Sequence, residues 1–125
     1  CMDSIHTLMR GFQDSAMDVV NLKINRIGGL TASRLFRDLC IKMGITMTIE
    51  DSWGGDIATA AIAHLAHSTP SEFHFQSSAF HEYTNLEIAS GGPVIKDGYM
   101  SVTDRPGLGV ETNMDALGDA VFVSS

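Results

Sequence analysis

Residues 19–29 read VVNLKINRIGG, and this stretch decides the fold. Aliphatic and β-branched residues at 19–24 predict a strand, and the glycine pair at the end of the stretch predicts a turn. Thr31 is the expected N-cap of a helix over 32–43. Lys23 therefore stands near the C-terminal end of a strand that precedes a helix, which is where α/β barrels keep their chemistry. We interpret Lys23 as an acid/base candidate; the alternative is a surface lysine at a strand tip.

The segments around this stretch alternate between helix and strand periodicity. Apolar residues are spaced as in an amphipathic helix over 2–15, and the further expected elements are a strand at 45–50, a helix at 55–68 and a strand at 73–77. Gly44 is the expected helix C-cap before the second strand. This alternation predicts an α/β fold, with a parallel sheet and helices packed outside it.

The character of the chain changes after about residue 80, where turn residues become frequent. Residues 93–102 predict a β-hairpin, because the pair Asp97-Gly98 at its centre is favoured in primed turns. The sequence Gly107-Leu108-Gly109 lacks the strand and helix that flank a phosphate-binding loop. We interpret it as a turn that supports the tail.

The length of the chain limits how much of a barrel it can form. Its 125 residues, 44% of them hydrophobic, fit one modest domain. A complete (β/α)8 barrel needs roughly 250 residues, so at most half a barrel is present. The chain also begins at Cys1 rather than at a methionine. We therefore expect a C-terminal fragment of a longer enzyme.

Charge and composition exclude several classes of partner. A net charge of -7 with eight Lys+Arg argues against nucleic acid, which requires clustered positive charge. The sequence contains no apolar run of about 18 residues, so no membrane span is predicted. Two cysteines cannot form a disulfide framework, and Cys40 lies on the apolar stripe of a helix as a small buried residue. These features predict a reduced, cytoplasmic setting.

Three motifs, in order, carry a family resemblance: the stretch at 19–29, IEDSWGGDI at 49–57 and RPGLGV at 105–110. Together they resemble the enolase superfamily, and more narrowly the C-terminal part of the mandelate racemase/muconate lactonizing enzyme family. Within it, the chain is similar to the subgroup of cis-3-hydroxy-L-proline dehydratases and proline-betaine epimerases. The resemblance implies about strands six to eight of a (β/α)8 TIM-type barrel over 1–80. It also implies a tail over 81–125 that joins the N-terminal capping domain.

The resemblance also implies the chemistry. Such enzymes remove the proton α to a carboxylate and stabilise the enediolate on Mg²⁺. By resemblance, Lys23 on strand six is the catalytic residue, whereas the metal carboxylates on strands three to five and a second lysine on strand two all precede this chain. Asp3 falls in the opening helix and is not interpreted as a ligand, so we expect no metal ligand within residues 1–125.

Four further residues are predicted to contact substrate. By resemblance, Glu50 and Asp51 hold the place of the histidine that other racemases use. Asp51 can bind the ring nitrogen of the substrate or orient Lys23, and Glu50 can do the same or face a helix; the alternative for both is a purely electrostatic role beside a helix N-terminus. Trp53 can stack its indole on a cationic amine or pack against loop residues. Asp56 is most simply the N-cap of the next helix, with substrate contact as the alternative.

The histidines and the loop after the third strand are secondary candidates. His64 and His67 lie three residues apart on a helix, without the spacing or the carboxylate of a zinc-protease helix, so we do not interpret them as metal ligands. By resemblance, the substrate pocket is completed by residues that end the third strand and enter the loop: Ser77, Ser78, Phe80 and Tyr83.

The functional prediction is a Mg²⁺-dependent dehydratase of cis-3-hydroxy-L-proline. Its expected partner is a small carboxylate substrate, a cyclic imino acid, and the enzyme is expected to be a homo-oligomer. One alternative is a racemase or epimerase of proline betaine or another amino acid derivative. An alternative from another class is a catalytically inactive half-barrel fragment that associates with itself.

Overall fold

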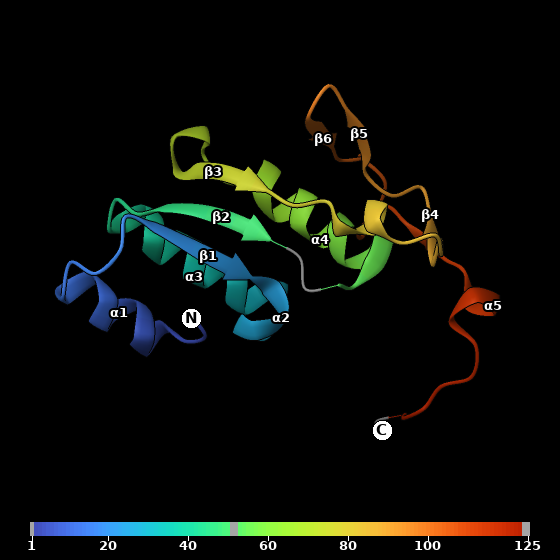
Figure 1. Ribbon diagram of the computed structural model, residues 1–125, viewed down its shortest axis with the longest axis horizontal. Helices are drawn as coiled ribbons and strands as arrows, with labels where there is room; N and C mark the ends of the chain where they lie inside the picture. The colour runs from blue at the N-terminus through green and yellow to red at the C-terminus, as the bar shows by residue number, and fades with distance from the viewer. Residues whose placement is uncertain (1, 51–52, 124–125) are drawn as a thin grey trace.

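A computed structural model describes residues 2–50 and 53–123. Its centre is a parallel sheet in the order β1 (Val19–Lys23), β2 (Thr46–Glu50) and β3 (His74–Ser77) (Figure 1). Val19 pairs with Thr46 and the register continues to Lys23 opposite Glu50. The parallel sheet that the alternating pattern predicted is therefore confirmed, with each strand within two residues of its expected bounds.

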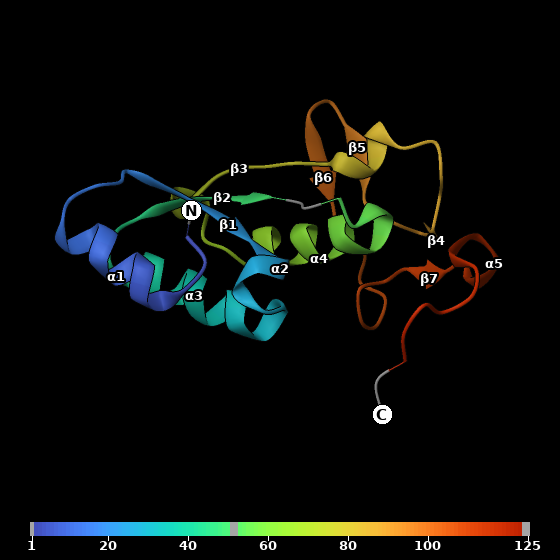
Figure 2. The same cartoon turned by 60° about the horizontal axis from the view of Figure 1, so that its bottom comes forward.

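Helices cover one face of this sheet. They are α1 (Ile5–Gln13), α3 (Leu30–Lys42) and α4 (Gly55–His67), and Figure 2 shows all three on the same side of the strands. Alternate strand residues point toward them and are buried, together with side chains of the helices: Leu8, Val20, Leu22, Phe36, Cys40, Met47, Ile49, Ile62 and Leu65. Consecutive parallel strands with their helices on one side are the arrangement found in the wall of a β/α barrel.

The structure corrects two details of the first stretch. The strand ends at Lys23, and α2 (Ile24–Ile27) adds a helical turn that the sequence did not predict. The N-cap of α3 is Gly29, so the prediction of Thr31 as the N-cap was wrong. The reason lies in the backbone, because Gly28 and Gly29 both have φ of 101°, which glycine adopts readily. The chain thus passes from α2 to α3 within two residues.

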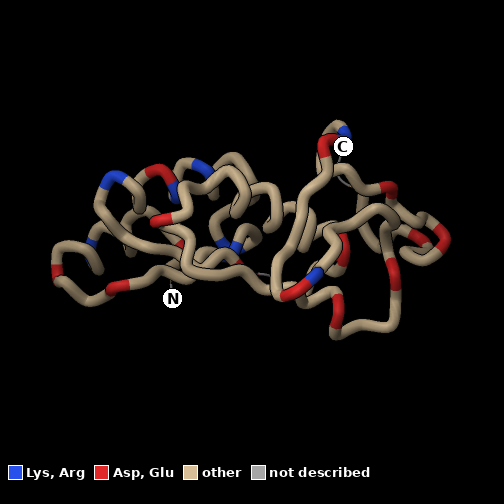
Figure 3. Tube along the Cα trace, turned by 90° about the horizontal axis from the view of Figure 1, so that it is seen from above, with Lys and Arg blue, Asp and Glu red and all other residues tan. Residues whose placement is uncertain are grey.

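The tail forms small antiparallel units along α4, from its first turn to its C-terminal half. Residues β5 (Val94–Lys96) and β6 (Tyr99–Ser101) pair as a hairpin, with φ of 52° at Asp97 and 79° at Gly98. Both turn residues have positive φ, as a type I′ turn requires, so the predicted primed hairpin is confirmed. The other elements after β3 are η2 (Phe80–Tyr83), β4 (Ala89–Ser90), β7 (Glu111–Thr112) and α5 (Met114–Leu117), whereas η1 (Ser71–Phe73) leads from α4 into β3. In the tail, Asp and Glu outnumber Lys and Arg (Figure 3).

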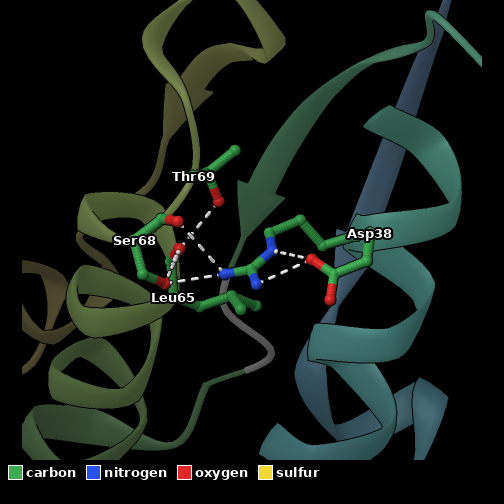
Figure 4. A network of polar contacts seen from close by, with 5 residues as sticks. Asp38, Leu65, Ser68 and Thr69 are labelled. Atoms are coloured by element: carbon green, nitrogen blue, oxygen red, sulfur yellow. Dashed lines mark hydrogen bonds and ion pairs between the residues drawn. The ribbon is translucent and has the colours of Figure 1, made fainter. Parts of the chain in front are cut away.

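A buried arginine ties α3 to the C-terminal end of α4 (Figure 4). Arg37 is 8% exposed, and its Nη1 donates to Ser68 Oγ at 2.7 Å and to the Ser68 carbonyl at 3.3 Å. Its Nε and Nη2 donate to Asp38 Oδ1. A guanidinium is tolerated in such a place only when its donors are satisfied, so this network is part of the packing between the two helices.

Cys40 is buried in the core, as its place on the apolar stripe predicted. Burial raises the pKa of its thiol to about 12, partly offset by a backbone hydrogen bond. Among the described residues, no helix is long and apolar enough to cross a membrane. The division of the chain at residue 80 stays a prediction.

Candidate functional site

The carboxyl ends of the three strands meet at one edge of the sheet, because the strands are parallel. Lys23 ends β1 and Glu50 ends β2, and the two residues are direct neighbours in the register. Lys23 Nζ lies 3.5 Å from Glu50 Oε2, with the two side chains 20% and 21% exposed. A cation and a carboxylate therefore face each other at the strand ends in a partly desolvated setting, where their attraction exceeds that of a surface pair.

A third residue, Asn21, completes this group. Asn21 lies two residues before Lys23 in β1, so both side chains project from the same face of the sheet, opposite to the buried Val20 and Leu22. Asn21 Nδ2 donates to Glu50 Oε2 at 2.7 Å. One carboxylate oxygen thus receives both an amide donor and the ammonium. The sequence prediction missed Asn21, although its spacing from Lys23 was a usable signal.

A second group at this edge is aromatic. Trp53 follows β2 with φ of 69° and is 69% exposed. Its ring centroid lies 5.0 Å from that of Phe80 and 6.4 Å from that of Tyr83, and the last two rings are 5.6 Å apart. We call these three residues the aromatic cluster. Trp53 therefore packs on residues of the loop, one of the two predicted alternatives, and much of its indole surface remains exposed.

Asp56 has a different local role from the one expected. The N-cap of α4 is Gly54, so the interpretation of Asp56 as the N-cap was wrong. Asp56 is the second residue of the helix and 9% exposed, and its Oδ2 accepts hydrogen bonds from the backbone N–H of Ile88 at 2.9 Å and of Ala89 at 3.2 Å. The carboxylate therefore binds backbone N–H groups of the tail and does not cap its own helix. Asp51, another predicted contact, lies outside the described residues.

The histidines make local contacts. His64 Nε2 lies 3.2 Å from the Leu108 carbonyl, which ties the predicted turn at 107–109 to α4. His74 Nε2 lies 2.9 Å from Ser77 Oγ within β3. Burial lowers the pKa of His74 below its ordinary value, and a backbone hydrogen bond to Gln76 opposes this. In residues 2–50 and 53–123, no group of three or more His, Cys, Asp or Glu side chains is placed to hold a metal.

The family of the chain follows from comparison with known proteins. Residues 1–116 match the family model described as enolase C-terminal domain-like, and the chain belongs to this family. It is 55% identical over 120 residues to cis-3-hydroxy-L-proline dehydratase of Roseibium aggregatum, which covers 96% of this chain and 33% of that protein. It is also 34% identical over 116 residues to muconate cycloisomerase 1 of Rhodococcus opacus, covering 92% of this chain and 30% of that protein. The chain thus spans about a third of the length of these relatives.

Solved structures agree with this assignment. A mandelate racemase/muconate lactonizing enzyme from Roseovarius nubinhibens superposes with a TM-score of 0.92 at 38% identity, over 98% of this chain and 33% of that one. The predicted family and fold class, a C-terminal part of a barrel with its tail, are therefore confirmed. The relatives are enzymes that include a dehydratase and a cycloisomerase, that is, a lyase and an isomerase.

Proposed function

We propose that this chain supplies the strand-six to strand-eight part of an enzyme that abstracts the proton α to a carboxylate, with Lys23 as the base. The narrower proposal is dehydration of cis-3-hydroxy-L-proline. The observation that carries it is the Lys23–Glu50 pair at the carboxyl ends of neighbouring strands, in a chain 55% identical to such a dehydratase. Catalytic groups of barrels lie at these strand ends.

Dehydration requires loss of the α-proton and loss of the β-hydroxyl, and Lys23 can carry out the first of these steps. When it is neutral, the Lys23 amine accepts the α-proton, the electrons of the C–H bond form a double bond to the β-carbon, and the C–O bond to the β-hydroxyl breaks. An acid, which we assign to the part of the enzyme outside this chain, donates the proton with which the hydroxyl leaves as water. Glu50 would hold the resulting ammonium in place, since its carboxylate lies 3.5 Å from Nζ. Asn21 would in turn fix the carboxylate through its 2.7 Å hydrogen bond.

The aromatic cluster is our candidate for the amine end of the substrate. An indole face attracts a protonated ring nitrogen or a quaternary ammonium through its negative quadrupole. Trp53 has much of its surface free for such a contact. We further propose that Asp51, which follows Glu50 in the sequence, binds the substrate's ring nitrogen. Asp56 is a weaker candidate for substrate contact, because its Oδ2 is already bonded to the tail.

Magnesium belongs to this proposal only through the rest of the enzyme. One structure from Roseovarius nubinhibens, 33% identical to this chain with a TM-score of 0.92, is complexed with magnesium. A Mg²⁺ site needs several oxygen ligands in near-octahedral geometry. The described residues here do not fit it, since the carboxylate at the strand ends, Glu50, already faces an ammonium. We therefore place the metal ligands on strands that precede this chain.

A chimera tests the proposed function. Residues 1–125 would replace the matching segment of the Roseibium aggregatum dehydratase, and the product from cis-3-hydroxy-L-proline would be followed by NMR in deuterated water. We expect loss of water in the chimera and a loss of at least about 10³-fold in turnover on Lys23→Ala, without a change of fold. Lys42→Ala, at the exposed end of α3, is the matched control. Normal turnover in Lys23→Ala would refute the role of Lys23.

The nearest rival is epimerisation of proline betaine or a related amino acid derivative. The aromatic cluster favours it as a second candidate, because quaternary ammonium groups bind to aromatic faces. The same chimera distinguishes the two reactions: an epimerase would exchange the α-proton and invert the stereocentre without releasing water. Assembly into a homo-oligomer and a cytoplasmic location are further parts of the proposal for the whole enzyme.

A further inference from the structure

Asp56 connects two segments that lie far apart in the sequence. Its buried carboxylate, in the first turn of α4, accepts hydrogen bonds from Ile88 and Ala89, 32 and 33 residues further along the chain. Ala89 is 2% exposed and belongs to β4. These two bonds therefore fix the end of the segment 78–87, which we call the mouth loop and which begins where β3 ends.

A glycine beside Asp56 supports the same contact. Gly55 has φ of 58°, and a Cβ atom built on it would lie 2.8 Å from Ile88 Cδ1. The Ile88 side chain thus packs against the first residue of α4, where the positive φ favours glycine. Two neighbouring residues at the start of α4, Gly55 and Asp56, hold the same point of the tail.

The aromatic cluster lies between these fixed points. Trp53 precedes Asp56 by three residues, whereas Phe80 and Tyr83 belong to η2 in the mouth loop. The start of α4 fixes the chain that carries Trp53, and the bonds of Asp56 fix the far end of the loop that carries the other two rings. We propose that Asp56 is a positioning residue that holds the mouth loop closed, so that Phe80 and Tyr83 stay packed on Trp53.

Asp56 would thereby shape the surface that receives the amine of the substrate, and this consequence rests on the proposed function. The positioning itself does not, because it concerns contacts within the chain. Removing the carboxylate leaves two N–H groups without their acceptor, one of them on the buried Ala89. Asparagine keeps one side-chain oxygen that can accept the same bonds.

Limited proteolysis of the 125-residue chain tests this inference. Chymotrypsin cuts after aromatic residues, and mass spectrometry would give the initial rate at Phe80 and Tyr83 relative to the rate at Phe12 in α1. We expect Asp56→Ala to raise this ratio about tenfold and Asp56→Asn to restore most of it. The control is Arg37→Met, which removes another buried charged side chain. Arg37 belongs to α3 and binds Ser68 at the opposite end of α4. It should leave the ratio unchanged.

The other outcomes contradict the inference. An unchanged ratio in Asp56→Ala would show that the mouth loop does not depend on the carboxylate. Equal acceleration at Phe12, Phe80 and Tyr83, including the case in which the variant unfolds, would show that Asp56 stabilises the fold as a whole. The readout uses no substrate and no activity, so failure of the proposed function would leave it interpretable.

Discussion

Lys23 and Glu50 are register partners at the carboxyl ends of two adjacent parallel strands, and 3.5 Å separates Nζ of the first from Oε2 of the second. The same oxygen accepts a hydrogen bond from Asn21. The Lys23 ammonium and the Asn21 amide thus share one oxygen of the Glu50 carboxylate. The position of the ammonium is therefore set from both strands.

Glu50→Gln should weaken catalysis in the chimera while preserving the shape of the site. The amide can still accept from Asn21 but no longer attracts the ammonium, so we expect kcat to fall about fivefold, as for loss of a pair worth about 1 kcal/mol. Asn21→Ala should cause a smaller loss in the same direction, because it frees the carboxylate without removing its charge. Steady-state kinetics provides both values, and an unchanged kcat in Glu50→Gln would argue against this arrangement.

Replacement of Trp53 should weaken substrate binding in steps. If the indole faces the ring nitrogen, Trp53→Phe retains a smaller aromatic face and Trp53→Ala retains none, with a loss of about 0.5–2 kcal/mol for the latter. Calorimetric titration of the chimera with a cyclic imino acid measures this. Tyr99→Ala, on the exposed hairpin, is the control. Equal affinity of all the variants would count against the contact.

The 125-residue chain should associate with itself when it is isolated. In the described structure, β1 and β3 each pair with β2 alone, so each has an unpaired edge. Phe75, in β3, is 65% exposed and adds apolar surface there. Sedimentation velocity should show association that Phe75→Lys reduces, whereas Leu35→Lys on the exposed side of α3 leaves it unchanged. A monomer at all concentrations would contradict this prediction.

The thiol of Cys40 should be unreactive in the folded chain. Burial in the core raises its pKa to about 12, so almost none is thiolate at pH 8, and the sulfur is also inaccessible. In a Cys1→Ser variant, a disulfide reagent should label no thiol under native conditions and one thiol per chain in guanidinium chloride. Rapid native labelling would show that the core around α3 opens readily.

His74 should make the fold less stable in acid. Burial places the folded pKa of this imidazole below its ordinary value of 6.5, so the unfolded chain binds the proton more tightly. The free energy of unfolding should therefore fall as the pH drops through 6.5 and level off below the folded pKa. Urea titrations at pH 5 to 8 should show that the free energy of unfolding changes less with pH in His74→Gln than in the unaltered chain. The same slope in both proteins would assign the acid sensitivity to other groups.

The sequence by itself determined the order and type of the main elements. Strand and helix periodicities at 18–77 and the Asp97-Gly98 turn are local patterns, set by residues within a few positions of one another, and the structure follows them closely. Lys23 could be recognised for the same reason, since its place at a strand end is visible in the stretch at 19–29. The family resemblance extended this reading to the barrel.

Only the tertiary structure decided which side chains meet. Glu50 binds a donor 29 residues before it, and Asp56 binds backbone groups 32 and 33 residues after it. Trp53 likewise meets rings from another loop. Local patterns do not specify such pairs, because they depend on the register between strands and on where a loop returns to a helix. Asp56 illustrates the difference. Its sequence neighbours suggested a helix cap, whereas the packing of the tail brings the backbone N–H groups of Ile88 and Ala89 within hydrogen-bond distance of its carboxylate.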